Sequence, residues 1–176
     1  TFKPHEEKLR KAITIFDQYF SSGRYFTNKQ YQNWKEEWGE FSDYISLPFE
    51  NLRTKDAFKE ILIKFSNYYK NGRLIIDRYN TKLSHNESEY LKKLLVNRNM
   101  PFNADQLMAA VSEEDNTLVV AGAGTGKTTT ILGKLVYLID CLRVLPEDIL
   151  LLSFTGKAVE ELENRVKKHF SDINIE

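Results

Sequence analysis

The feature that most constrains this chain is a glycine-rich run between an apolar stretch and a helical pattern. Residues 119–129 read Val-Val-Ala-Gly-Ala-Gly-Thr-Gly-Lys-Thr-Thr. The run fits the phosphate-binding pattern G-x-x-x-x-G-K-[ST] at Gly126, Lys127 and Thr128, whereas Ala121 stands at the first glycine position. An apolar strand before such a loop and a helix after it are the setting that phosphate binding requires. The run therefore predicts a phosphate-binding loop, with a simple glycine-rich turn as the alternative.

The chemistry of this loop follows from its residue types. Glycines let the backbone adopt positive φ, so that successive N–H groups can converge on one anion, and the helix that follows adds its amino-terminal dipole. We expect Lys127 to reach the β- and γ-phosphates of a nucleotide and the Thr128 hydroxyl to bind its Mg²⁺ ion, which makes both candidate catalytic residues. The residues expected to hold the nucleotide are Ala121, Gly122, Ala123, Gly124, Thr125, Gly126, Lys127, Thr128 and Thr129.

Length and composition limit the rest only loosely. The 176 residues could form one ordinary domain, or a small domain and part of another. The formal net charge is zero, so no global field points to a nucleic acid or a membrane. Cys141 is the only cysteine, which excludes an internal disulfide and suits a reducing compartment. No apolar run approaches the length of a membrane span, so we expect a soluble, cytoplasmic protein with no membrane partner.

Two regions differ in composition. Of the aromatic residues Phe, Trp and Tyr, 18 lie up to Asn99 and 4 follow it. The first region also holds 18 Lys and Arg against 13 Asp and Glu, a surplus of 5. We therefore predict an α-helical module over residues 1–99 and a second domain over residues 100–176.

Helical periodicity dominates the first region and predicts helices over residues 6–20, 29–45, 55–79 and 87–96. A break near Gly72 is left open, and Ser84 with Glu87 has the spacing of a capping box before the last helix. Glycine and proline, as at Pro48, punctuate the pattern.

Aromatic stripes within these helices allow two interpretations. The stripes are formed by Trp34, Trp38, Phe41 and Ile45, and by Phe58, Leu62, Phe65 and Tyr69. The favoured interpretation is that they face a core, because amphipathic helices need such stripes to fold. Interleaved with lysines, they would also fit a surface on which single-stranded nucleic acid stacks. The three histidines are scattered and predict no zinc site.

The second region alternates helices and strands. Its pattern predicts a helix over 103–112, a strand over 118–121, a long helix to about Leu142, a strand over 149–154 and a helix over 157–170. Strand, loop, helix and strand form a βαβ unit with parallel strands and a right-handed crossover. We therefore expect the α/β fold class.

From Phe102 onward the chain resembles the first motor domain of UvrD/Rep-type superfamily 1 DNA helicases. Three segments stand in the family's order and are similar to its Q motif, motif I and motif Ia, at residues 102–106, 121–128 and 149–161. Alanine at the position of Ala121 is usual in this family. Gly156 and Val159 depart from the pattern, because the family commonly has Asn and Ala there.

The resemblance implies an incomplete RecA-like P-loop domain that uses ATP and Mg²⁺ and contacts single-stranded or partly duplex DNA. Gln106 would hydrogen-bond the adenine edge, although its spacing from Asn103 equally fits a helix capping box, and both can hold. Phe154 and Thr155 match positions that touch the DNA strand in the family, and Lys157 lies beside them as a third candidate contact. The alternative for them is a core phenylalanine and a solvated lysine.

No apolar strand ending in paired acids follows Thr155 in these 176 residues, and the later motor motifs of the family are not found. We expect the N-terminal portion of an ATP-dependent DNA helicase that translocates on single-stranded DNA, in which this piece alone hydrolyses ATP poorly or not at all. The βαβ pair would also lack the strand that lies between motifs I and Ia in such folds. Two other hypotheses stay open: a helical module that binds a protein partner or restrains the motor, and an unrelated P-loop phosphotransferase. The oligomeric state is not predicted.

Overall fold

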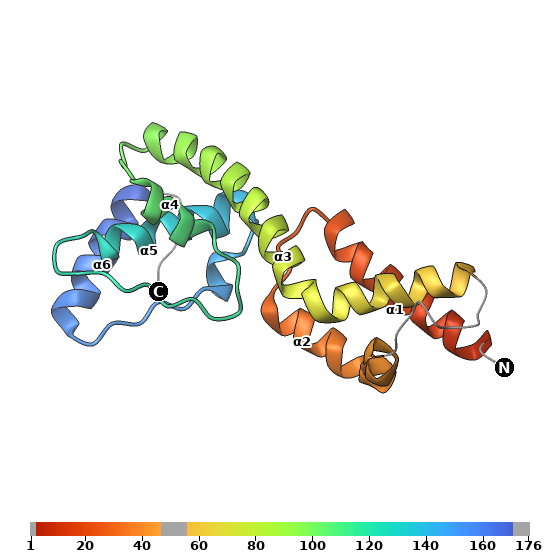
Figure 1. Ribbon diagram of the computed structural model, residues 1–176. Helices are drawn as coiled ribbons and strands as arrows, with labels where there is room; N and C mark the ends of the chain where they lie inside the picture. The colour runs from red at the N-terminus through yellow and green to blue at the C-terminus, as the bar shows by residue number, and fades with distance from the viewer. Residues whose placement is uncertain (1–2, 47–55, 171–176) are drawn as a thin grey trace. The chain divides into compact units, whose positions relative to one another are not determined.

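Helices make up all the regular secondary structure of the described residues, 3–46 and 56–170 of the computed structural model (Figure 1). They are α1 (Lys3–Ser21), α2 (Asn28–Glu37), the 3-10 helix η1 (Gly39–Ser46), α3 (Asp56–Asn97), α4 (Ala104–Val111), α5 (Lys127–Val136), the π-helical turn η3 (Tyr137–Cys141), the 3-10 turn η4 (Pro146–Asp148) and α6 (Gly156–His169). The chain divides into two compact units. The first unit is Thr1–Leu83 with Glu113–Asn116, and the second is Ser84–Ser112 with Thr117–Glu176, so that α3 contributes to both.

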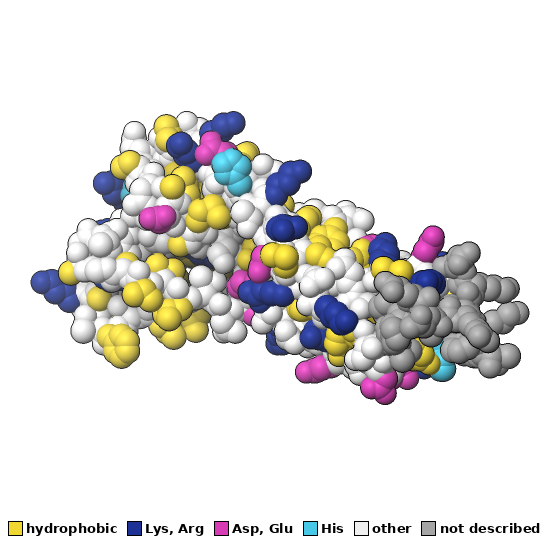
Figure 2. Space-filling model, viewed as in Figure 1, with side chains coloured by type: hydrophobic (Ala, Val, Ile, Leu, Met, Phe, Trp, Pro, Cys, Tyr) yellow, Lys and Arg dark blue, Asp and Glu magenta, His cyan; other side chains and the backbone are white. Residues whose placement is uncertain are grey.

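The predicted α/β fold class is wrong for the described residues, because no strand forms in them. Residues 118–121 and 149–154, the expected strands of the βαβ unit, lie outside any helix or ladder. Leu118, Val120 and Leu152 are 87%, 88% and 83% exposed. A strand is stable where a neighbour pairs with its backbone and covers its side chains, and the described residues supply neither to these two segments. Hydrophobic side chains accordingly gather on the surface of the second unit in Figure 2.

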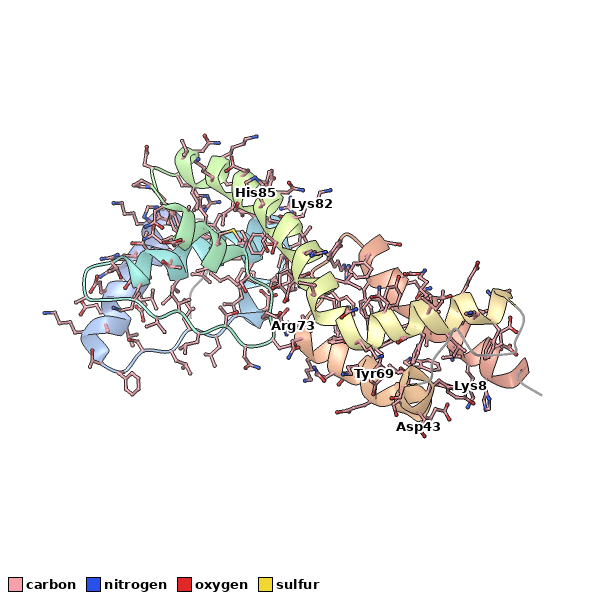
Figure 3. The ribbon with its side chains drawn as sticks, viewed as in Figure 1. Lys8, Asp43, Tyr69, Arg73, Lys82 and His85 are labelled. Atoms are coloured by element: carbon pink, nitrogen blue, oxygen red, sulfur yellow. The ribbon has the colours of Figure 1, made fainter. Side chains whose placement is uncertain are left out.

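The aromatic stripes form the core of the first unit, which confirms the favoured interpretation. The buried members are Trp34, Trp38, Phe41, Ile45, Phe58, Leu62 and Phe65, all at most 6% exposed. Phe16 of α1 stacks on Tyr68 at 4.2 Å between ring centroids and meets Trp34 edge-on at 5.0 Å. Tyr69 (labelled in Figure 3) is only partly buried, and the Lys35 Nζ atom lies 4.5 Å from its ring centroid.

The helices of the first unit follow the periodicity closely, with two differences. The predicted helix 29–45 is split into α2 and η1. The predicted helices 55–79 and 87–96 are one continuous helix, α3, and the Ser84 capping box is wrong because Ser84 is buried in its interior. Gly72 does not break α3: a Cβ there would lie 2.6 Å from the Tyr31 ring, so glycine allows α2 to approach closely. Lys55 and Pro48 lie outside the described residues.

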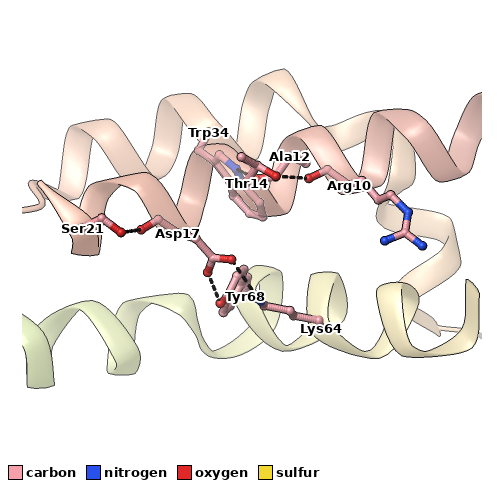
Figure 4. A network of polar contacts seen from close by, with 8 residues as sticks. All are labelled: Arg10, Ala12, Thr14, Asp17, Ser21, Trp34, Lys64 and Tyr68. Carbon is pink, nitrogen blue, oxygen red and sulfur yellow. Dashed lines mark hydrogen bonds and ion pairs between the residues drawn. The ribbon is translucent and has the colours of Figure 1, made fainter. Parts of the chain in front are cut away.

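Polar contacts join the helices of the first unit across this core. In Figure 4 the Asp17 carboxylate accepts hydrogen bonds from the Tyr68 hydroxyl at 2.5 Å and from Lys64 Nζ at 2.8 Å. Trp34 Nε1 donates to the carbonyl oxygen of Ala12 at 2.9 Å. These bonds hold α1 against α2 and α3. Because they pair particular polar groups, they specify the arrangement of the three helices more narrowly than aromatic packing alone would.

A buried carboxamide holds the loop between α1 and α2. Asn80 Nδ2 donates to the Phe26 carbonyl at 2.8 Å, and the Phe26 N–H donates to Asn80 Oδ1 at 3.0 Å. One residue further, Thr27 and Gln30 form a capping box that starts α2. Asn80 therefore satisfies both polar backbone groups of a fully buried residue.

The core of the second unit gathers the ends of several helices. Its buried members include Leu91, Leu95, Met100, Leu107, Val111, Leu132, Val136, Tyr137, Val166 and Phe170. The end of α3 is closed by Asn99 at φ 55°, with Met100 N donating to the Leu95 carbonyl at 2.9 Å. The predicted helices 103–112 and 157–170 are confirmed as α4 and α6, and the long helix after the loop as α5 with η3.

Cys141 lies in η3 and is partly buried. Burial raises the pKa of its thiol to about 11, with Glu87 and Asp140 adding to the shift. The thiol is therefore protonated at neutral pH, as expected of a packed apolar side chain. In the part of the chain that the structure describes, no helix has the length and apolar character to cross a bilayer.

Asn80→Ala is expected to lower the free energy of unfolding of the first unit by about 2 to 4 kcal/mol, because it leaves two buried backbone groups of Phe26 without partners. Both tryptophans lie in this unit, so urea unfolding followed by tryptophan fluorescence reports on it. Asn71→Ala is the matched control on the same helix, since Asn71 is exposed and bonds the exposed Asn67 side chain, and it should change the value by about 0.5 kcal/mol or less. Equal effects of the two substitutions would contradict this role of Asn80.

Candidate nucleotide-binding site

The loop before α5 turns at two glycines that have positive φ angles. Gly124 and Gly126 adopt φ angles of 75° and 90°, in the left-handed region that favours glycine. Gly126 is the N-cap residue of α5, and no side chain caps this end of the helix. The first-turn N–H groups of a helix have no intrahelical partners, and in general such groups can bind anions. Gly122 does not share the positive φ that its neighbours adopt.

Lys127, the first residue of α5, folds back over the loop. Its Nζ atom donates to the carbonyl oxygens of Ala121 at 3.0 Å and Gly122 at 2.6 Å. The Thr125 hydroxyl also donates to Gly122 at 2.9 Å, which closes the turn. The ammonium group therefore lies at the loop, and its N–H groups donate to carbonyl oxygens of the loop itself.

Gln106 connects the Q-like segment to this loop. Asn103 and Gln106 form a capping box at the start of α4, with Gln106 N donating to Asn103 Oδ1 at 2.9 Å and Asn103 N donating to Gln106 Oε1 at 3.0 Å. The capping interpretation is thus confirmed. Gln106 Nε2 donates at 3.1 Å to the carbonyl oxygen of Thr125. A carboxamide has two donor hydrogens and two acceptor lone pairs, so one of each remains for a ligand.

Two further contacts dock the Q-like segment and α4 on α5, and sequence reasoning missed both. The ring of Phe102 lies against Gly133, where an added Cβ would overlap the ring. Lys134 Nζ donates to the carbonyl oxygen of Ser112 at 2.5 Å. A glycine within a helical pattern was the available signal, because such a glycine often marks a close approach of another element.

The residues of the motif Ia-like segment lie at the start of a different helix. Thr155 is the N-cap of α6, and its hydroxyl oxygen accepts from Ala158 N at 3.2 Å. Phe154 is fully exposed, which excludes the alternative that it belongs to the core. Lys157 is also exposed, one residue into α6. An aromatic ring, a hydroxyl and a cation therefore stand together in solvent.

A separate hollow of about 690 Å³ lies in the second unit, beside α5, α6 and residues 146–153. Most of its lining is apolar, including Leu135, Ile139, Leu151 and Val166, and it contains none of the predicted nucleotide residues. We assign it no ligand. Across residues 3–46 and 56–170, no three His, Cys, Asp or Glu side chains come together to hold a metal ion.

Comparison with known proteins agrees with the order of the motifs. Residues 102–176 match the family model described as the UvrD/REP helicase N-terminal domain. This segment is thus similar to the UvrD/Rep-type helicases, and the resemblance predicted from its motifs is confirmed.

Similar curated proteins carry helicase names. DNA helicase IV of Escherichia coli (strain K12) is 28% identical over 174 residues, which cover 94% of this chain and 25% of that protein. ATP-dependent DNA helicase Rep of Buchnera aphidicola subsp. Schizaphis graminum is 37% identical over 43% of this chain and 12% of its own length. ATP-dependent DNA helicase PcrA of Staphylococcus aureus is 39% identical over 40% of this chain and 10% of its own length. The chain thus spans a quarter or less of these relatives, and no solved structure matches it.

Gly126→Ala is expected to destabilise the second unit more than Gly124→Ala. Both substitutions place a side chain at positive φ, at a cost of about 1 to 2 kcal/mol each. At Gly126 the new Cβ would also lie 2.6 Å from Gln106 Nε2, whereas nothing lies within 4 Å at Gly124. Calorimetric unfolding should show an extra loss of about 1 kcal/mol at Gly126 from the displaced hydrogen bond to Thr125. In a Gln106→Ala background the two substitutions should cost the same, and a difference that persisted there would contradict the contact.

Proposed function

We propose that this chain supplies the nucleotide-binding loop, and one contact with the DNA strand, of an ATP-dependent DNA helicase that translocates on single-stranded DNA. The observation that carries the proposal is the open amino end of α5, with left-handed Gly126 as its N-cap and Lys127 beside it. The helicase names of the relatives support the same class of activity.

The loop residues fit the triphosphate of ATP. The amides of the first turn of α5 and the backbone of residues 121–126 would bind phosphate oxygens, and Lys127 Nζ would exchange its bonds to two carbonyl oxygens for bonds to phosphate. Thr128, in the first turn, would offer its hydroxyl to a Mg²⁺ ion held mainly by the phosphates. One hydroxyl ligand suits magnesium, which usually keeps several waters and few protein ligands. The ion would supply charge neutralisation when bound.

Gln106 fits the base end of the nucleotide. Its carboxamide is anchored by Asn103 and Thr125, so its remaining donor and acceptor have a fixed direction. That pair is complementary to the donor and acceptor of the adenine edge.

The strand contact would be made by the start of α6. The exposed Phe154 ring offers a face on which a base can stack, and Lys157 offers charge to a phosphate. The Thr155 hydroxyl accepts from Ala158 N and keeps its own hydrogen for a phosphate oxygen. A role in DNA metabolism is also consistent with a cytoplasmic location, which forms part of the proposal.

ATP with Mg²⁺ is expected to stabilise the chain by about 2.7 kcal/mol at one hundred times its dissociation constant, measured by differential scanning calorimetry. Lys127→Ala should remove most of this stabilisation, because the phosphates lose their cation. Lys157→Ala is the matched control: it should keep the response to ATP and weaken binding of single-stranded oligo-dT. No stabilisation at millimolar ATP, or an equal response from Lys127→Ala, would contradict the proposed site.

A further inference from the structure

Arg98 stands where α3 ends and makes contacts that the nucleotide and strand sites do not use. Its N–H donates to the Leu95 carbonyl in the closing turn of α3. Its guanidinium group reaches two other elements of the second unit. One nitrogen donates to Asp140 Oδ2 in η3 at 2.7 Å, and the other donates to the carbonyl oxygen of His169 at 3.0 Å.

The setting makes these contacts stronger than an ordinary surface ion pair. The Arg98 and Asp140 side chains are 29% and 27% exposed, whereas Arg165 and Glu161 in an ion pair on α6 are 42% and 58% exposed. Screening by salt weakens exposed pairs most. The guanidinium carbon of Arg98 also lies 5.1 Å from the centroid of the buried Phe170 ring.

The two acceptors lie at the far ends of the helices that begin at the proposed sites. Asp140 belongs to η3, which continues α5 from the nucleotide loop. His169 is the last residue of α6, and a cation at this carbonyl satisfies an orphan acceptor and complements the helix dipole. Burial and the charges of Lys168 and Arg98 lower the pKa of His169, so its ring is neutral at pH 7 and does not repel the guanidinium.

The η3 segment is a suitable place to transmit movement along α5. It is a π-helical turn, in which Leu142 N donates to the Tyr137 carbonyl at 3.1 Å. Such turns are rare and are found mostly as single insertions within α-helices, often at functional sites. A shift of α5 along its axis must therefore either move Asp140 relative to Arg98 or carry Arg98 and the end of α6 with it.

We propose that Arg98 is a positioning residue that couples the nucleotide loop at the start of α5 to the strand contact at the start of α6, by holding the far ends of both helices. This inference rests on the proposed function, since it needs both ligands to bind. Coupling of this kind is reciprocal: each ligand changes the dissociation constant of the other by the same factor.

The test measures that factor in the 176-residue chain with Mg²⁺–AMP-PNP, which is not hydrolysed, and a short oligo-dT. Titration calorimetry gives the dissociation constant of AMP-PNP with and without saturating oligo-dT. The unsubstituted chain should show a change of about fivefold or more. Arg98→Met should reduce this ratio to about one, while the constant for AMP-PNP alone changes less than about threefold, which a merely structural defect would not produce.

Two further variants and a control sharpen the result. Asp140→Asn keeps the volume of the side chain and removes its charge, so it should lower the ratio even where Arg98→Met fails to fold, and the double variant should lose no more than either single one. Arg165→Met removes an arginine and an ion pair from α6 but should keep the full ratio. Absence of AMP-PNP binding by the unsubstituted chain would contradict the proposed function itself. Binding of both ligands without coupling, or a ratio that survives Arg98→Met and Asp140→Asn, would contradict the inference alone.

Discussion

The hydrogen bond from Gln106 Nε2 to the Thr125 carbonyl is the contact on which the proposed nucleotide site depends. It joins the capped start of α4 to the residue before Gly126, whose left-handed backbone turns the chain into α5. Because α5 has no side-chain cap, its first amides stay open to an anion only while this turn is held. The close approach of Gln106 to Gly126 also explains why glycine is needed there, in addition to its positive φ.

Local signals predicted most of the helices and the shape of the loop. Capping and periodicity are properties of a few neighbouring residues, and α1, α4, α5 and α6 follow them. The Thr27–Gln30 capping box has the same local sequence signal at the start of α2. Ser84 and Glu87 also have the capping-box spacing, but they predicted a helix start wrongly, because Ser84 lies within the continuous helix α3.

The prediction of two strands was wrong for a physical reason, because strand formation depends on partners that a local sequence pattern does not reveal. The apolar character of residues 118–121 and 149–154 satisfies the composition of a strand, but pairing depends on a second backbone and on cover for both faces. Neither is present among the described residues, and the side chains stay exposed. Tertiary contacts such as Asn80 with Phe26, or Arg98 with Asp140, were equally beyond sequence reasoning, because 54 and 42 residues separate the partners. The residues proposed to bind ATP and DNA stay predictions, whereas the resemblance of residues 102–176 to the helicase family is confirmed by the match to its model.

The central claim, that the loop is assembled to grip a nucleotide, is tested most directly by amide NMR of the ¹⁵N-labelled chain. Adding Mg²⁺–ATP should shift the backbone amides of Gly124, Gly126, Lys127 and Thr128 and the side-chain amide of Gln106, and should leave the Asn80 side-chain amide in place. Shifts of this kind are expected because the loop amides and the Lys127 ammonium group would bind the phosphates, whereas the Gln106 carboxamide would bind the base of the same ligand. An unchanged loop at saturating ATP, or shifts confined to the first unit, would contradict the account.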